Sequence, residues 1–437
     1  MKMVFKLMIV FSVIAVLAGL ECILNCSCNL VAYPVPQRAK LVDNTKVPEP
    51  KTLTLMVYMA ADNDLESHAI RNLKAMERAD FSNINVLVLM DRSQDYDETN
   101  DNWTDTRLFE VTHDTSNGSS IVSKRLDCPP LGLSQNSTTE LDMGNYNVLK
   151  AFVEFTRETY QAQNYALIIW GHGTGWRYSK AESGPGSVSA SRAVAIDDKS
   201  NSYICVRELG LALMDQQLCV IGFDTCFGSV FENLYELKDC SQYIVASPGL
   251  TPAAGWDYKT LLQELSGTEL SAQQIASKMA QANTREITIT DTKTLDPLMT
   301  ELEAFSKALS QTIVDQSTRR SVLDTLIRTK SYSYTQYPCD LYIDIFSMAQ
   351  AFSQTPDEQL RTASKNLADL SNGIQTGLLL IPQTARGVLS TSHSQDYIKD
   401  SANTTQCTFI KQSEWWVPTK SGSSQSVLDK LFYQSFE

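Results

Sequence analysis

The stretch from Cys219 to Ser229 (CVIGFDTCFGS) combines a buried strand, a tight turn and the start of a helix. Its apolar run, Val220 to Phe223, has the length of a short buried strand, and beyond Gly228 the apolar residues recur at helical spacing. Cys226 is therefore predicted where a strand gives way to a helix. Such strand ends open into the ligand-binding crevice of an α/β sheet. A thiol close to a helix N-terminus is also favoured as a thiolate, because the peptide dipoles present their positive end there.

A second stretch has the same design. The apolar run Tyr165 to Trp170 ends in Gly171-His172-Gly173, and the chain contains only 4 histidines. A cysteine and a histidine at the tips of two neighbouring buried strands would form a nucleophile–base pair. The alternative is a buried structural thiol and an ordinary loop histidine. The placement of both residues at strand ends favours the catalytic interpretation.

These motifs together resemble the clostripain family of cysteine peptidases, within the caspase, gingipain and legumain group. A His-Gly pair follows one apolar run and an Asp-x-Cys follows the next. The resemblance covers most of the chain and extends through the stretches Val57–Glu66, Trp170–Trp176, Ala246–Tyr258, Asp340–Asp344 and Gly377–Pro382. It implies an α/β fold: a three-layer αβα sandwich with a mainly parallel caspase-like sheet, plus C-terminal helical additions.

The order of predicted elements supports this fold class. Buried strands are predicted over 53–59, 84–90, 165–170, 220–223 and 242–246, with helices over 147–160 and 206–216. Strands that alternate with helices indicate a largely parallel sheet covered on both faces. Asp62 is predicted to cap the helix after the first strand, and Asp64 likewise is interpreted as a capping residue rather than a metal ligand. Farther on, helices are predicted over 261–285, 297–313, 319–330, 340–352 and 427–432, and a buried strand over 377–381.

The chain is predicted to divide into four segments. Residues 1–28 form a signal peptide or a lipoprotein signal, because Lys2 and Lys6 precede an apolar segment that extends to Leu24. A linker or pro-segment (29–50), a caspase-like catalytic core (51–260) and a mostly helical C-terminal region packed on that core (261–437) follow. Neither Cys26 nor Cys28 has a good lipidation context. The protein is expected to be exported, and secretion and lipid anchoring at the bacterial cell envelope both remain open.

The resemblance implies roles for the two central residues. Cys226 would attack the scissile carbonyl and form a thioester, and His172 would act first as general acid and then as general base. The backbone N–H groups of Gly173 and Cys226 are the expected oxyanion donors, since both lie in strand-end turns. No third residue that orients the histidine is expected.

The family cleaves after Arg or Lys, and such a pocket needs a carboxylate. Asp224 matches the family position that faces this pocket; the alternative role for it is a helix N-cap. A second acid often follows the next strand, but here the sequence has Gly249-Leu250-Thr251. Asp257 is the nearest substitute, unless it is only a turn residue. Trp256 could form a pocket wall or be a core aromatic.

The segment from Arg177 to Lys199 is rich in Ser and Gly and carries scattered basic residues. Members of the family are often cut between the histidine and the cysteine. Self-cleavage after Lys180 or Arg192 is therefore expected, and a plain surface loop is the alternative.

The formal net charge of −13 argues against nucleic acid as a partner. The expected partners are protein or peptide substrates with Arg or Lys, and a membrane only through a lipid anchor. A monomer of one or two chains is expected. No cofactor is required and no metal ligands are assigned, but the resemblance leaves calcium activation open. Two other functions stay open: a catalytically silent, peptide-binding surface protein and another cysteine amidase.

Overall fold

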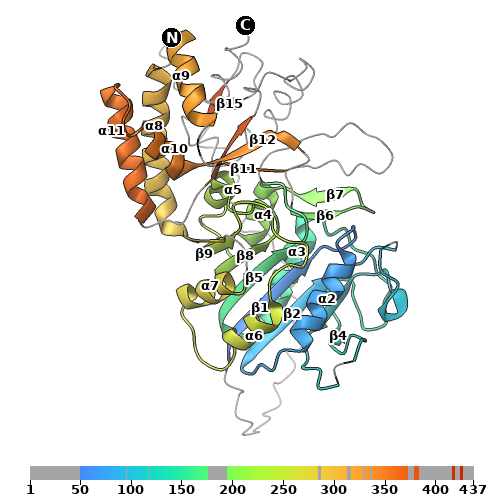
Figure 1. Ribbon diagram of the computed structural model, residues 1–437. Helices are drawn as coiled ribbons and strands as arrows, with labels where there is room; N and C mark the ends of the chain where they lie inside the picture. Colours follow the sequence, from blue (N-terminus) through green and yellow to red (C-terminus); the bar gives the residue numbers. More distant parts are fainter. Residues whose placement is uncertain are drawn as a thin grey trace, which may run out of the picture. The chain divides into compact units, whose positions relative to one another are not determined.

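An eight-stranded sheet forms the centre of the described part of the chain (Figure 1). The structure, a computed structural model, describes residues 50–94, 96–116, 118–175, 194–283, 287–312, 316–327, 329, 331–334, 337–372, 378–382, 416–418 and 424–426. All of them belong to the unit from Pro50 to Glu437. Among these residues, no helix has both the length and the apolar character that crossing a membrane requires.

The strand order is β10-β9-β8-β5-β1-β2-β3-β4. The five strands from β9 to β2 run parallel, and β10, β3 and β4 pair antiparallel at the two edges. The strands are β1 (Lys51–Met59), β2 (Ile84–Met90), β3 (Arg107–Glu110), β4 (Lys124–Leu126), β5 (Ala162–Trp170), β8 (Leu218–Asp224), β9 (Ser241–Ala246) and β10 (Thr288–Asp291). The predicted mainly parallel sheet is confirmed.

Helices cover both faces of this sheet. On one face, Met56 and Tyr58 of β1 join a core cluster with α3 (Tyr146–Thr159), α4 (Val206–Leu213) and α5 (Phe231–Glu236). On the other face, Leu55 and Val57 join α2 (Glu66–Glu77), α6 (Tyr258–Leu265) and α7 (Ala272–Gln281). Successive residues of a strand point to opposite faces, which explains why β1, β2 and β8 are apolar almost throughout. The three-layer αβα arrangement is thereby confirmed.

The C-terminal helices extend the first of these two clusters. Leu298, Phe305, Met348 and Leu367 are buried in the same core as α5. They come from α8 (Leu295–Thr312), α10 (Ile345–Phe352) and α11 (Glu358–Asp369), with α9 (Gln316–Ile327) beside α10. The eighth strand of the central sheet, β10, lies beyond residue 260, where the sequence predicts the end of the catalytic core.

Smaller elements complete the described part. A three-stranded antiparallel sheet has the order β11-β12-β13. Two short antiparallel pairs, β6–β7 and β14–β15, accompany it. The bounds are β6 (Val194–Asp197), β7 (Ser202–Ile204), β11 (Ser331–Tyr334), β12 (Tyr337–Asp344), β13 (Leu378–Pro382), β14 (Trp416–Pro418), β15 (Ser424–Ser426), η1 (Asn100–Asn102), η2 (Pro129–Leu131), η3 (Thr292–Thr294) and η4 (Leu370–Asn372).

Two of the helix predictions are wrong. The helix expected over 340–352 begins only at Ile345, because Asp344 accepts a hydrogen bond from the backbone N–H of Ser347 and residues 337–344 form β12. The helix expected over 261–285 is two helices, α6 and α7. Gly267, with φ of +92°, follows the first, and Ser271 caps the second. The helix predicted over 427–432 lies outside the described residues.

Candidate active site

The strands that precede His172 and Cys226 are neighbours in the sheet. Strands β5 and β8 run parallel with Trp170 opposite Asp224, and the backbone N–H of Gly171 donates to the carbonyl of Asp224 at 3.3 Å. The two turns therefore leave the sheet at the same level and at the same edge. A nucleophile–base pair at the tips of two strands requires those strands to lie side by side, and β5 and β8 do.

Gly173 joins the two turns tightly. A Cβ atom at this position would lie 2.4 Å from the carbonyl oxygen of Cys226 and 2.7 Å from Oγ1 of Thr225. Contacts that short do not occur, so only glycine fits without displacing the backbone of the cysteine turn. His172, the residue before it, is thereby carried to the edge of the Cys226 turn.

His172 has a carboxylate partner that the sequence does not predict. Its Nε2 lies 2.6 Å from Oδ1 of Asp64, and this hydrogen bond holds the pKa of Asp64 below its ordinary value. Asp64 follows β1, the strand next to β5. The loop that carries it is fixed by Asn63, whose amide donates to the carbonyls of Ala60 and Ile196. An ionised carboxylate only accepts, so Nε2 carries the proton and Nδ1 is the ring nitrogen available for proton exchange.

The expected capping roles of Asp62 and Asp64 are wrong. Helix α2 begins at Glu66 after Leu65, and no side chain caps it. Asp62 lies earlier in the loop and is buried. The signal that could have located the histidine partner is the Asp-Asn-Asp run that begins three residues after the end of β1, because acids that follow neighbouring parallel strands meet at one edge of the sheet.

Replacing Asp64 with asparagine is expected to lower kcat by about tenfold and to leave KM within about twofold, because the substitution disturbs the orientation of His172 and not the substrate pocket. Steady-state kinetics would measure this split, and Asp64→Glu should restore part of kcat. Asp80→Asn, an exposed acid beyond the other end of α2, is the matched control. An unchanged kcat in Asp64→Asn would remove Asp64 from the site.

The thiol of Cys226 contacts the segment after β9. The backbone N–H of Thr251 donates to Sγ at 3.3 Å, and the carbonyl of Thr251 lies 3.7 Å from Sγ. Thr251 Oγ1 also donates to the carbonyl of Thr225 at 2.8 Å, and the N–H of Phe227 donates to the carbonyl of Gly249. The 249–251 segment, which lacks the expected second acid, thus holds the Cys226 turn in place.

The predicted helix-dipole effect on Cys226 is wrong, because α5 begins only at Phe231 and Cys226 lies in the preceding turn. Its candidacy as nucleophile rests on its position and on the protonation of the four other thiols whose side chains the structure describes. Burial raises the pKa of each of these thiols to about 11 or 12, which keeps them protonated and unreactive: Cys128, Cys205, Cys219 and Cys240.

Asp224 is buried beneath the site. Its Oδ2 accepts hydrogen bonds from the backbone N–H of Trp256 at 3.1 Å and from the hydroxyl of Tyr258 at 2.9 Å. Its Oδ1 is buried with no partner among the described residues. Burial raises the pKa of Asp224 to about 7, although both hydrogen bonds act in the opposite direction. The alternative role as a helix N-cap is wrong, since Val230 stands at the N-terminus of α5.

The other two predicted pocket residues have structural contacts. Trp256 is buried, and a Cβ atom at Gly222 would lie 2.8 Å from its ring. Asp257 caps α6: its two oxygens accept from the backbone N–H and the hydroxyl of Thr260. Asp257 therefore already has partners for its charge. The predicted processing sites, Lys180 and Arg192, lie outside the described residues.

A model of the Clostripain family matches residues 57–424. Clostripain of Hathewaya histolytica is 27% identical over 231 residues, which are 49% of this chain and 42% of that protein. The match thus spans less than half of the length of this curated relative.

Two solved structures share the fold. An inactive zymogen of a C11 protease from Parabacteroides distasonis superposes with a TM-score of 0.54 at 18% identity, covering 89% of this chain and 99% of that one. A secreted C11 cysteine protease from Bacteroides thetaiotaomicron, iotapain, gives a TM-score of 0.53 at 17% identity, covering 87% and 91%. At these identities the likeness concerns the fold alone.

Proposed function

Because the chain belongs to the clostripain family of cysteine peptidases, we propose that it is an exported endopeptidase that hydrolyses peptide bonds after Arg or Lys. The observation that carries this proposal is the meeting of two turns at one edge of the sheet. The His172 turn and the Cys226 turn follow neighbouring strands in register, and Gly173 packs against the carbonyl of Cys226. Such an arrangement is what a nucleophile and its acid–base partner require.

The reaction runs in two halves. The thiolate of Cys226 attacks the scissile carbonyl carbon, and the backbone N–H groups of Gly173 and Cys226 stabilise the oxyanion. His172 gives a proton from Nδ1 to the leaving amine, the C–N bond breaks, and a thioester remains. His172 then takes a proton from water, and the hydroxide attacks the thioester. The C–S bond breaks, the acid product leaves, and the Cys226 thiolate and the protonated His172 are restored. Asp64 holds the imidazole by Nε2 through both halves.

The proposed specificity rests on Asp224. A buried carboxylate oxygen without a partner is costly unless a cation neutralises it. The side chain of an arginine or lysine substrate would supply that cation at Oδ1, while Trp256 and Tyr258 keep Oδ2 in position. Pairing between a carboxylate and a guanidinium is strong and geometrically specific.

The proposal is tested with fluorogenic peptides that present Arg, Lys, Ala or Asp before the reporter group. Activity on Arg and Lys peptides alone is the expected result. Activity confined to Ala or Asp peptides would contradict the basic pocket, and activity confined to non-peptide amides would indicate another cysteine amidase. Peptide binding with no hydrolysis of any substrate would indicate a silent binding protein.

Self-cleavage is a separate expectation. A peptidase that cuts after basic residues is expected to cut its own chain after Lys180 or Arg192, so purified wild type should migrate as two chains on a denaturing gel. N-terminal sequencing of the second chain should begin at Ala181 or Ala193. The Cys226→Ala variant and the double variant Lys180→Ala/Arg192→Ala should each stay whole. A wild-type enzyme that is fully active as one uncut chain would contradict the idea.

Export and assembly complete the proposal. The apolar N-terminal segment favours export, and one structural relative is described as secreted. The enzyme is proposed to act as a monomer, of one chain or of two after cleavage, on protein or peptide substrates. Lipid anchoring at Cys26 or Cys28 would be its connection to a membrane.

A further inference from the structure

A leucine with an exposed side chain lies beside Cys226. Leu250 belongs to the segment between β9 and α6, and its exposed fraction is 43%. Exposed leucines are common on protein surfaces. The position of Leu250 relative to the thiol, rather than its exposure, therefore carries the inference.

The two peptide groups that flank Leu250 both bind the Cys226 turn. The carbonyl of Gly249 accepts a hydrogen bond from the N–H of Phe227 at 2.8 Å, and the N–H of Thr251 donates to Sγ of Cys226 at 3.3 Å. The α-carbon of Leu250 is two covalent bonds from that nitrogen, so it lies no more than about 6 Å from Sγ. A peptide whose carbonyl carbon is attacked by Sγ therefore passes within reach of the Leu250 side chain.

The backbone around Leu250 is held rigidly. The hydroxyl of Thr251 donates to the carbonyl of Thr225 at 2.8 Å, and proline fixes the φ angle at positions 248 and 252. The exposed side chain is thus presented on a backbone that needs little further ordering when a ligand binds. Such preorganisation lowers the entropy cost of binding.

The order of the strands decides which part of the substrate meets Leu250. The His172 turn follows β5 on one side of β8, and the 249–251 segment follows β9 on the other side. In the proposed reaction His172 protonates the leaving amine, so the part of the substrate after the cut bond faces β5. The part before the cut bond then faces β9. With the Arg or Lys side chain directed to Asp224, the residue immediately before it is the one nearest to Leu250.

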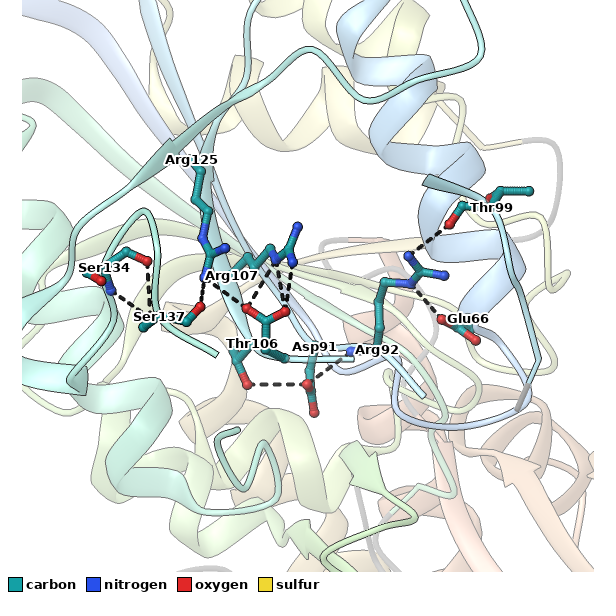
Figure 2. A network of polar contacts seen from close by, with 10 residues as sticks. Glu66, Asp91, Arg92, Thr99, Thr106, Arg107, Arg125, Ser134 and Ser137 are labelled. Atoms are coloured by element: carbon teal, nitrogen blue, oxygen red, sulfur yellow. Dashed lines mark hydrogen bonds and ion pairs between the residues drawn. The ribbon is translucent and has the colours of Figure 1, made fainter. Parts of the chain in front are cut away.

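The two sides of the site also differ in charge. The segment from Pro248 to Ala254 (PGLTPAA) contains no charged side chain. Toward β1 and β2 the site carries Asp64, and Figure 2 shows the ion pair between Arg92 and Glu66, whose atoms lie 2.6 Å apart. A charged substrate residue beside Leu250 would lose hydration without gaining a partner from this segment, whereas an apolar one would remove apolar surface from water.

We propose that Leu250 forms a subsite for an apolar side chain at the substrate residue immediately before the Arg or Lys. The inference rests on the proposed function and adds to it a second determinant of specificity. Leu250 touches no reacting atom, so it binds the substrate in its ground state and in the transition state alike. Its effect is therefore expected in KM more than in kcat.

The experiment uses fluorogenic peptides of the form acetyl-Gly-Xaa-Arg-reporter, in which Xaa is Leu, Ala or Asp, with the full chain. We expect kcat/KM of the wild type to be about tenfold higher for the Leu peptide than for the Ala peptide, and lower still for the Asp peptide. Leu250→Ala should reduce the ratio of Leu to Ala to about two or less. Leu250→Lys should raise the Asp peptide relative to the Leu peptide by about tenfold or more, because it removes the apolar contact and adds an opposite charge.

Leu211→Ala is the matched control, because Leu211 of α4 is exposed to the same degree, 44%, and should leave the ratio of Leu to Ala as in the wild type. Equal hydrolysis of the Leu and Ala peptides by the wild type would overturn the inference and leave cleavage after Arg intact. A ratio that stays at the wild-type value in Leu250→Ala would do the same. Failure to hydrolyse any of the three Arg peptides would instead overturn the proposed function, and this inference with it.

Discussion

Replacing Cys226 with alanine will abolish hydrolysis of Arg and Lys peptides, with kcat/KM falling by roughly ten-thousandfold or more, as expected when a nucleophile is removed. The reason is positional: Cys226 occupies the turn after β8, against Gly173 and beside the loop of His172. The side chain is small and the neighbouring contacts are made by backbone atoms, so the variant should keep the fold. Circular dichroism and thermal unfolding would verify this.

The matched control is Cys205→Ser. Cys205 is a second partly exposed thiol, at the start of α4, where serine is also a suitable N-cap residue. Its kcat/KM should remain within about twofold of the wild type. A Cys226→Ala variant that retained more than a tenth of the activity would contradict the assignment of Cys226 as the nucleophile. Loss of activity in Cys205→Ser alone would assign that role to Cys205 instead.

The second large effect concerns specificity. Asp224→Asn keeps the size of the side chain and can still accept from Trp256 and Tyr258, but it removes the charge. We expect kcat/KM for an Arg peptide to fall by about a hundredfold, since one member of a buried charge pair is lost. A peptide with citrulline, the uncharged isostere of arginine, should be affected far less. Asp257→Asn, at the cap of α6, is the matched control and should preserve the preference for Arg.

The same residue predicts a pH dependence. Burial raises the pKa of Asp224 from its ordinary value of 3.8 to about 7, so the charged form appears only as the pH rises through that range. The ratio of kcat/KM for Arg over citrulline peptides should therefore increase up to about pH 7 and then level off. The ratio removes the titration of Cys226 and His172, which both substrates share. In Asp224→Asn the ratio should be flat, and a flat wild-type ratio would exclude Asp224 from the pocket.

The same pKa shift lowers the stability of the folded protein as the pH rises, whereas it raises the preference for Arg. The folded state holds the proton of Asp224 more tightly than the unfolded state does. This stabilising contribution is complete below the ordinary pKa and is lost as the pH rises toward about 7. A cationic substrate side chain at Oδ1 would compensate for the loss. The residue that selects the substrate is thus one that weakens the free enzyme at neutral pH.

The sequence predicts the parts of this site that depend on local patterns. Apolar runs and the glycines that end them locate β5 and β8 and place His172 and Cys226 at their tips. The three-layer fold follows from the alternation of strands and helices. These signals are short in range, and the structure confirms both.

Contacts between distant segments are not predictable in this way. The pairing of Asp64 with His172 requires β1 to lie beside β5, and nothing local in either stretch states that order. The contact of Thr251 with Cys226 depends in the same way on the path of the chain after β9. The sequence predicts a helix over residues 340–344 because a short apolar run has no clear period. In the structure these residues form a strand, because they pair with β11 and β13.

The parallel register of the central strands determines when the site can form during folding. Met59, Trp170 and Asp224 stand at one level across three strands, and the residues of the site follow directly after them. A slip of two residues in either pairing would shift a turn by about 6.6 Å, too far for proton transfer. The proposed site is therefore expected to form only when β1, β5 and β8 have paired in this register.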